Sequence, residues 1–554
     1  MHIAKTGRRH WGWQAMIVLA LGTGMVGCER QRSPAATEAF REIPRRDFNL
    51  KAAEAAAPFF WVEDTNQNGA LEARELAVLW REENTARWIS GGQFTPQFAQ
   101  TYRQLTDTAE PTEGRLKWVA DELEQGVPTL VYADFSSASE EDRALVRQMV
   151  VVAQAVERLH MAQLGSLTYA DQIDALDPPS RALFLRNQAP WCMAPATEGQ
   201  AGCSALNEAP ARISGLYPAD LQEKPGFCES LAKHSDAAVL LDRWHAVRRR
   251  DGNLVAVPYS EAFKTEMVAV AEALRTLVPL LPEGQEDALR AYVLAAARAF
   301  ETNDWPSADE KWVEMEGAGS RWYLRVAPDE MYFSPCGRKA MIQFSFGQVD
   351  RRSRTWKRKL ALVESKMEQQ LASLAGAPYK ARDVDFKAPD FVNIVLNAGD
   401  ARRPSGAYIG QSLPLRGPLV QAGRQRTLAF SNLYSDPDSR VQLKSLADNY
   451  FCADSAGIFS SEPKPRVITA VLNDASRNLG PTPEYLLGGK TPAEIFGGQL
   501  ATILEEVKAM AASMYLIGWL KNKELIEPKV AHQVYAFGVI GALNHITRGV
   551  FAPD

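Results

Sequence analysis

The residues whose types and spacing best suit catalysis lie between positions 467 and 510. Asn473 and Arg477 are four residues apart in a segment whose apolar residues recur at helical spacing, so both side chains project from one face of a predicted helix. Asp474 directly follows the first of them. This is the spacing of the H-E-x-x-H motif, in which two histidines bind zinc and the glutamate is the general base. Here neither histidine position holds a histidine.

The residues at these positions are poor zinc ligands. An asparagine oxygen binds zinc weakly compared with imidazole or thiolate. Arginine has no acceptor atom and stays protonated, so Arg477 would repel a dication. The same guanidinium can instead replace the positive charge of a metal beside Asp474 and Glu506. We therefore expect no zinc, and we expect Arg477 within ion-pair distance of Glu506 or Asp474.

Two predicted helices must position these side chains. The first ends at Gly480-Pro481, and its apolar residues at helical spacing are Ile468, Val471, Leu472, Ala475 and Leu479. The second follows a loop rich in glycine and proline. We expect its apolar stripe to pack against the core; the stripe consists of Leu500, Ile503, Leu504, Val507, Ala511 and Met514.

The segment from Asn473 to Pro481 resembles the H-E-x-x-H-G-x-G-P stretch of the dipeptidyl peptidase III-like metallopeptidases. In that family a downstream E-E-x-(K/R)-A helix supplies the third zinc ligand, and residues 505–509 of this chain follow that pattern. The resemblance implies that the scaffold is kept while the chemistry is mostly lost. It therefore implies no catalytic residues and a vestigial pocket formed by Asn473, Asp474, Arg477, Glu505 and Glu506.

Further segments resemble the same family and follow its order from about residue 120 to the end. The resemblance implies an α+β, predominantly α-helical, two-lobed body with a smaller β-rich part. Alternating apolar and polar residues place that β-rich part at about 320–430. The segments in question are 217–220, 303–312, 327–332, 397–402 and 410–414.

A second motif, from Asp64 to Glu75, fits the twelve-residue calcium loop of the EF-hand. Gly69 permits the sharp turn, and Leu71 occupies the usual apolar position. We expect helices on both sides, one Ca²⁺ ion, and moderate affinity of ~10⁻⁵ to 10⁻³ M, as in extracellular modules. The alternative is a loop that keeps the turn and binds nothing. The expected ligands are Asp64, Asn66, Asn68, Ala70 (through its carbonyl), Glu72 and Glu75.

The first residues are typical of a targeting segment. A charged start is followed by an apolar stretch too short to remain as a membrane span, ending at Met25-Val26-Gly27-Cys28. This end resembles the lipobox of bacterial lipoproteins, which implies that residues 1–27 are a signal peptide and that Cys28 is lipidated. Residues 28–48 would then be a flexible tether to a membrane of the bacterial cell envelope. The alternative is a plain signal peptide.

Composition bounds the remaining possibilities. The chain of 554 residues is long enough for several cores, and its net charge of −5 gives no basic footprint for nucleic acid. We divide it into a helical segment at 49–110 that holds the calcium loop and a body at 111–554, with the candidate site helices at 467–520. An exported protein permits disulfides, and Cys192 with Cys203 would close a short loop.

These patterns favour a calcium-binding, membrane-anchored envelope lipoprotein. Its body would be an inactive metallopeptidase homologue that binds a peptide or protein in the old cleft. Two alternatives stay open. The first is an active peptidase with an altered metal site that uses Asp474, Glu506 and Asn473. The second is a purely structural calcium-binding lipoprotein.

Overall fold

The computed structural model describes residues 40–546 apart from short gaps. Cys28, the predicted signal peptide at 1–27 and residues 28–39 of the predicted tether lie outside the described residues. Within the described part, no helix is both long and apolar enough to cross a membrane. The gaps are 79–81, 108–110, 126–130, 316–318, 331–333, 351–359, 361, 385–388, 403–409, 416, 423 and 435.

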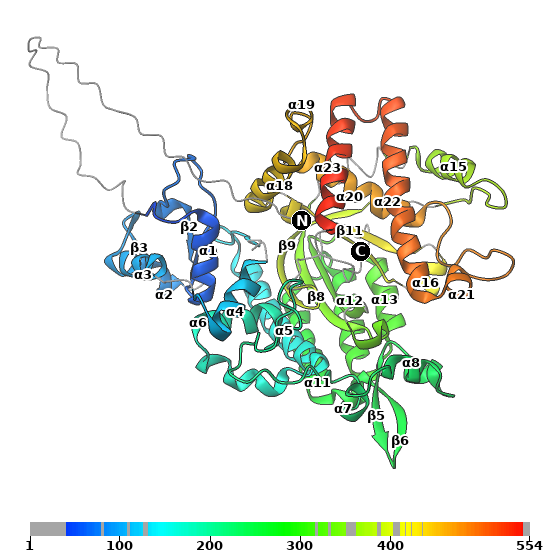
Figure 1. Ribbon diagram of the computed structural model, residues 1–554, viewed down its shortest axis with the longest axis horizontal. Helices are drawn as coiled ribbons and strands as arrows, with labels where there is room; N and C mark the ends of the chain where they lie inside the picture. The colour runs from blue at the N-terminus through cyan, green and yellow to red at the C-terminus, as the bar shows by residue number, and fades with distance from the viewer. Residues whose placement is uncertain are drawn as a thin grey trace, which may run out of the picture.

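Residues 40–106 form a small N-terminal module with its own aromatic core, at the left of Figure 1. Phe48 of the first helix is fully buried and packs against Phe59 and Tyr102. Burial of several aromatic rings stabilises a unit this small. Its elements are α1 (Arg45–Glu54), β1 (Phe59–Trp61), η1 (Ala73–Glu75), β2 (Leu76–Val78), α2 (Glu82–Trp88), β3 (Ile89–Ser90), β4 (Gln93–Phe94) and α3 (Pro96–Thr106).

The expected helices on both sides of the calcium loop are wrong. The loop at 64–75 joins β1 to β2, which pair antiparallel with Trp61 opposite Leu76. The helix α1 ends at Glu54, before the β1 strand that leads into the loop. The physical reason is the burial of Phe59, Trp61 and Leu76 in the module core, which favours alternation along a strand over the helix propensity of the flanks.

The first half of the body is mainly helical and includes one β-hairpin, β5–β6. The long helix α5 starts at the Ser139 cap, whose hydroxyl accepts a hydrogen bond from Asp142 N, and ends at Gly165 with a left-handed backbone. The elements are α4 (Gly114–Glu124), α5 (Glu140–Leu164), η2 (Leu167–Ala175), α6 (Pro178–Asn187), α7 (Ala219–Gln222), α8 (Phe227–Ala232), α9 (Ala237–Leu240), β5 (His245–Arg250), β6 (Asn253–Pro258), α10 (Tyr259–Ala262), α11 (Lys264–Leu277), η3 (Val278–Leu280), α12 (Asp287–Thr302) and α13 (Trp305–Glu314).

A mixed five-stranded sheet lies at the centre of the body, in the order β10-β11-β9-β8-β7. Only β11 and β9 pair in parallel, and the other neighbours are antiparallel. All five strands lie within 322–430, so the predicted β-rich part is confirmed. The elements of this region are β7 (Trp322–Glu330), η4 (Pro335–Gly337), β8 (Met341–Val349), α15 (Glu364–Ala375), β9 (Asp390–Gly399), β10 (Gly410–Leu413), α16 (Pro418–Gln421) and β11 (Arg426–Phe430).

The C-terminal part is a group of helices packed beside the sheet (Figure 1). The elements are α17 (Ser431–Tyr434), α18 (Pro437–Tyr450), α19 (Ala453–Ala456), α20 (Pro463–Asn478), α21 (Pro492–Phe496), α22 (Gly498–Asn522) and α23 (Pro528–Ile546). Two large hydrophobic cores result. One joins α5, α11, α12 and α13 to the sheet, and the other joins α15, α20, α22 and α23. The fold is α+β, predominantly helical and two-lobed, as predicted.

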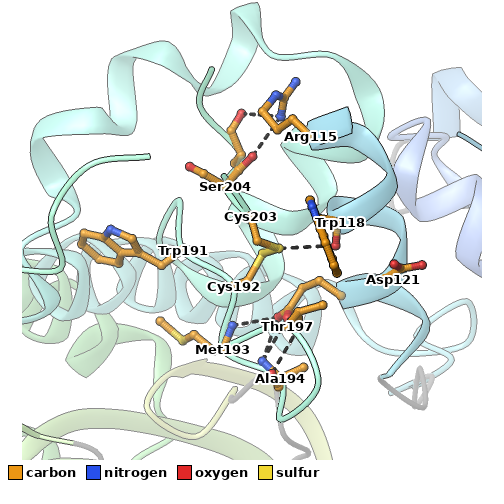
Figure 2. Close-up of a disulfide and its surroundings, with 12 residues drawn as sticks. Arg115, Trp118, Asp121, Trp191, Cys192, Met193, Ala194, Thr197, Cys203 and Ser204 are labelled. Carbon is orange, nitrogen blue, oxygen red and sulfur yellow. Dashed lines mark hydrogen bonds between the residues drawn. A yellow bond between two sulfur atoms is a disulfide. The ribbon is translucent and has the colours of Figure 1, made fainter. Parts of the chain in front are cut away.

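Two disulfides lie in the body. Cys192 and Cys203 are bonded, which confirms the expected short loop, and this loop lies against α4 beside Trp118 (Figure 2). Cys228 is bonded to Cys336, a pairing that the sequence did not indicate. Cys452 keeps its thiol.

The loop at 192–203 is also attached to α4 by a buried carboxylate. Glu122 is fully buried and accepts hydrogen bonds from the backbone N–H groups of Met193 and Ala194, at 3.0 Å each. The Thr197 hydroxyl donates to the same carboxylate, and Arg186 pairs with it at 2.6 Å. These partners compensate for the desolvation of a buried charge.

A buried charge network joins the sheet to α13. Arg325 on β7 is 1% exposed and pairs with both Asp309 and Asp329; its distance to Asp309 is 2.8 Å. Its guanidinium also lies over the Trp312 ring. Each charged group in this network is buried. Removing one of them would therefore leave its partners as uncompensated buried charges.

Replacing Arg325 with methionine should therefore lower the free energy of unfolding by roughly 3–5 kcal/mol, because two buried carboxylates lose their partner. Urea denaturation measures this. The control is Arg275→Met, which removes a pair with Glu301 whose side chains are both largely exposed, and which should cost less than about 1 kcal/mol. Equal losses for the two variants would contradict the prediction.

Candidate functional site

The candidate site is formed where α20 packs against α22. Helix α20 starts with prolines at its first turn, and Ile468, Val471 and Leu472 are buried as the sequence predicted. The helix ends at Asn478. Gly480 follows with φ of +69°, a backbone conformation that other residues adopt at a cost.

The predicted core-facing stripe of α22 is wrong for its N-terminal part, although Met514 does pack against the core. Leu500, Ile503, Leu504 and Val507 are exposed, and the face that packs into the core carries instead Ala509, Ala512, Leu516, Ile517 and Leu520. The helix is apolar on nearly all sides, so apolar spacing alone could not identify its buried face. Glu505 and Glu506 lie on α22 beside its contact with α20.

Arg477 and Glu506 form a two-pronged ion pair between the helices. One guanidinium nitrogen of Arg477 donates to Glu506 Oε2 at 2.6 Å, and the other donates to Oε1. The Arg477 side chain is 33% exposed and that of Glu506 is 19% exposed. Forked geometry of this kind is among the stronger charged hydrogen bonds, and it fixes the register of two elements. The contact expected from the sequence is present.

Asp474 lies beside this pair without a close hydrogen bond to it. Its carboxylate is 3.9 Å from Arg477 Nε, and its side chain is 13% exposed. Burial raises the pKa of Asp474 to about 7; nearby Arg477 opposes the shift and Glu506 adds to it. The carboxyl therefore holds a proton at mildly acidic pH. Asn473 Oδ1 is buried and makes no hydrogen bond to any described residue.

Lys508 is a site residue whose role sequence reasoning missed. Its Nζ donates to the carbonyls of Ser476, Arg477 and Leu479, at 2.9 to 3.2 Å, and it pairs with Glu505 at 2.9 Å. It thus caps the C-terminal end of α20, where carbonyls lack partners and the helix dipole favours a cation. Burial lowers the pKa of Lys508 and raises that of Glu505, and their pairing opposes both shifts. The i, i+3 spacing of Glu505 and Lys508 was the available signal.

Side chains from α15 and from the segment after it hold the turn that follows α20. Glu368 on α15 is fully buried and accepts from Gly480 N at 2.7 Å and from the Tyr379 hydroxyl at 2.6 Å. Arg382 donates to the carbonyls of Asn478 and Gly480. The end of α20 is therefore fixed from three directions, and the Arg477 backbone is fixed with it.

The residues at this site do not fit zinc. Both Glu506 oxygens accept hydrogen bonds from Arg477, and a fixed cation occupies the position from which a second histidine would bind. Asn473 and Asp474 together supply only oxygen donors, which zinc uses less readily than imidazole or thiolate. The arrangement can join helices and hold a proton on Asp474.

No protein family model matches the chain, and no curated protein matches it in sequence. Among solved structures, dipeptidyl peptidase III structures are similar. The one from Caldithrix abyssi has a TM-score of 0.65 and 20% identity, covering 78% of this chain and 81% of that chain. The one from Corallococcus sp. strain EGB has a TM-score of 0.63 and 18% identity, covering 78% and 80%. The chain therefore has the fold of dipeptidyl peptidase III.

The predicted calcium loop is compact. Asp64 accepts from the backbone N–H groups of Asn68 and Gly69, at 3.1 and 2.8 Å. Glu75 turns back to the start of the loop, where it accepts from Thr65 N at 2.8 Å. Glu72 accepts from the Asn68 side-chain amide at 3.1 Å. The groups of this loop that could bind a metal are oxygens, which calcium prefers as ligands. Among the described residues, no three Asp, Glu, His or Cys side chains gather as a metal site.

Replacing Arg477 with methionine should lower the free energy of unfolding by roughly 1–3 kcal/mol, because Glu506 loses its partner in a half-buried position. The loss is expected below the 3–5 kcal/mol of a fully buried pair, since a third of the Arg477 side chain is exposed. The matched control is Arg440→Met: Arg440 is equally exposed, but its partner Glu462 is 65% exposed. An equal loss in both variants would contradict the prediction.

The Asp474 carboxyl should make stability depend on pH. Its folded pKa of about 7 lies above its unfolded value of about 3.9, so the native state holds the extra proton between those pH values. The stability that the protonated carboxyl contributes is therefore fully present below about pH 4 and is lost as pH rises through 7. Relative to the unaltered chain, Asp474→Asn should become more stable by up to roughly 4 kcal/mol from pH 4 to 8. A pH-independent difference in urea denaturation would contradict this.

Proposed function

We propose that this protein is a catalytically inactive homologue of dipeptidyl peptidase III that binds a peptide or protein between its lobes. The fold provides the general argument, since the structural neighbours are named as dipeptidyl peptidases. The observation that carries the loss of catalysis is the ion pair of Arg477 with Glu506. This pair occupies both carboxylate oxygens of Glu506, the side chain that the family pattern would assign as a zinc ligand.

The inactive assignment depends on the metal ligands and not on Asp474. Burial raises the pKa of Asp474 to about 7, a value that also suits a general base. Without two imidazoles beside Glu506, the residues present favour a binding protein over a hydrolase.

Metal analysis of the purified full chain tests this proposal. We expect less than one-tenth equivalent of zinc and no cleavage of dipeptidyl substrates. The triple variant Asn473→His, Asp474→Glu, Arg477→His should gain close to one equivalent of zinc, because it restores two imidazole ligands and frees Glu506. Stoichiometric zinc together with peptide cleavage in the unaltered chain would instead identify an active enzyme with an altered site.

The protein is further proposed to be a lipoprotein of the bacterial cell envelope, anchored to a membrane through Cys28. The lipobox-like end of the first apolar stretch supports this. Labelled palmitate should be incorporated into the full chain in cells and lost in Cys28→Ser. Incorporation that is unchanged in the variant would contradict the proposed site.

A third part of the proposal is that the loop from Asp64 to Glu75 binds one Ca²⁺. Its support is the complete sequence pattern and the inward turn of the Glu75 carboxylate. Since exported proteins meet abundant calcium, the site would be largely filled and structural. Loop oxygens from side chains and from the Ala70 carbonyl would hold the ion.

Calcium should raise the melting temperature of the full chain by several degrees at millimolar concentration, because it binds the native loop alone. Glu75→Gln should abolish the rise, since it removes one of the charged ligands. The matched control is Glu63→Gln, just outside the loop, which should keep it. Equal calcium responses of the two variants would contradict the assigned ligand.

A further inference from the structure

The N-terminal half of α22 carries a continuous apolar surface that nothing in the described chain covers. We call it the α22 patch and define it by Phe496, Leu500, Ile503, Leu504, Val507 and Met510, each at least 40% exposed. Phe496 ends α21, and the others follow at helical spacing along α22. Spacing of three and four residues places them along one face of the helix.

The patch lies on the side of α22 opposite to the residues that the helix buries in the core. The residues that α22 buries in the core, such as Ala509, Ala512 and Leu516, are about half a turn away from Val507 and Leu500. Figure 1 shows α22 beside α20 and α23 at the outer side of this helical group. Glu506 lies three residues after Ile503 and four before Met510, so the Arg477–Glu506 pair borders the patch.

The patch exposes a larger apolar area than isolated exposed residues normally do. Six side chains that are each about half exposed present roughly 500 Å² of apolar surface. Two copies of such a patch would bury about 1,000 Å² in total, which is the smallest area expected of a specific interface. A helix that is apolar all round is normally covered on all sides.

The charges around the patch restrict what can cover it. In α21 and in the first four turns of α22 the charged residues are Glu494, Glu505, Glu506 and Lys508. Glu506 is neutralised by Arg477 and Glu505 by Lys508. A helix that lies on anionic lipid carries lysine and arginine beside its apolar face, and this one does not. Glu494 keeps its charge in the capping box at the start of α21, while the stripe itself carries no net charge and can meet its own copy without strong repulsion.

We propose that the α22 patch binds a second copy of this chain, with the two α22 helices packed antiparallel about a two-fold axis. In a two-fold interface each copy uses the same surface, so the interface must be self-complementary. A straight helical stripe with no net charge of its own satisfies that condition. Leu504, near the middle of the stripe, would lie close to the axis and to Leu504 of the other copy.

Site-directed cross-linking in cells tests the geometry with the full chain. Leu504→Cys, in a Cys452→Ser background, should form a disulfide-linked dimer under oxidising conditions, because residues near the axis approach within bonding distance. The matched control is Val441→Cys on α18, whose native side chain is 71% exposed, and it should stay monomeric. Equal cross-linking at both positions, or none at Leu504→Cys, would overturn the proposed interface.

Sedimentation of the purified chain carrying Cys28→Ser tests the equilibrium. The chain should form dimers at micromolar concentration, and Val507→Glu should raise the dimer dissociation constant at least tenfold without changing the melting temperature measured on the monomer at high dilution. Val441→Glu should leave it unchanged. A monomer at all concentrations would refute the proposal. Flotation with anionic vesicles that is lost in Val507→Glu, without any dimer, would assign the patch to a lipid surface instead.

Discussion

The packing of the C-terminal helices depends on how charges are compensated where α20 meets α22. The Arg477–Glu506 pair crosses between the helices, and Lys508 caps the end of α20 from the facing helix. Both interactions need the same register of the two helices. The candidate site therefore has a structural role whatever it binds, because any change in the register would expose three carbonyls and unpair the Glu506 carboxylate.

Similar compensation recurs in the rest of the molecule. Arg325 joins the sheet to α13 through Asp309 and also pairs with Asp329 of its own strand, and Glu122 attaches the disulfide loop to α4. In each case a buried charge from one element is satisfied by groups on another element. Such networks specify one arrangement of elements, because any other arrangement leaves a charge without its partner. They explain how a body with many short helices keeps a single packing.

The sequence predicted the fold and part of the site for identifiable reasons. The helix α20 was predicted correctly, since its apolar residues fall on one face and Gly480 ends it. The stripe of α22 was predicted on the wrong face because the helix is apolar nearly all round. The helices around the calcium loop were wrong because aromatic burial outweighed local propensity. Lys508 and Glu368 were missed because their roles depend on contacts with residues distant in the chain.

Burial raises the pKa of Asp474, and the charges at the site decide how far. A zinc ion would carry two positive charges, whereas Arg477 carries one, and Glu506 already balances it. A further ionised carboxylate in the same buried position would have no counter-charge, so a proton on Asp474 restores neutrality. The proton on Asp474 and the Arg477–Glu506 pair thus act in the same direction, since each lowers the number of uncompensated charges between the two helices. As these side chains stand, the contact of α20 with α22 is a connection between helices.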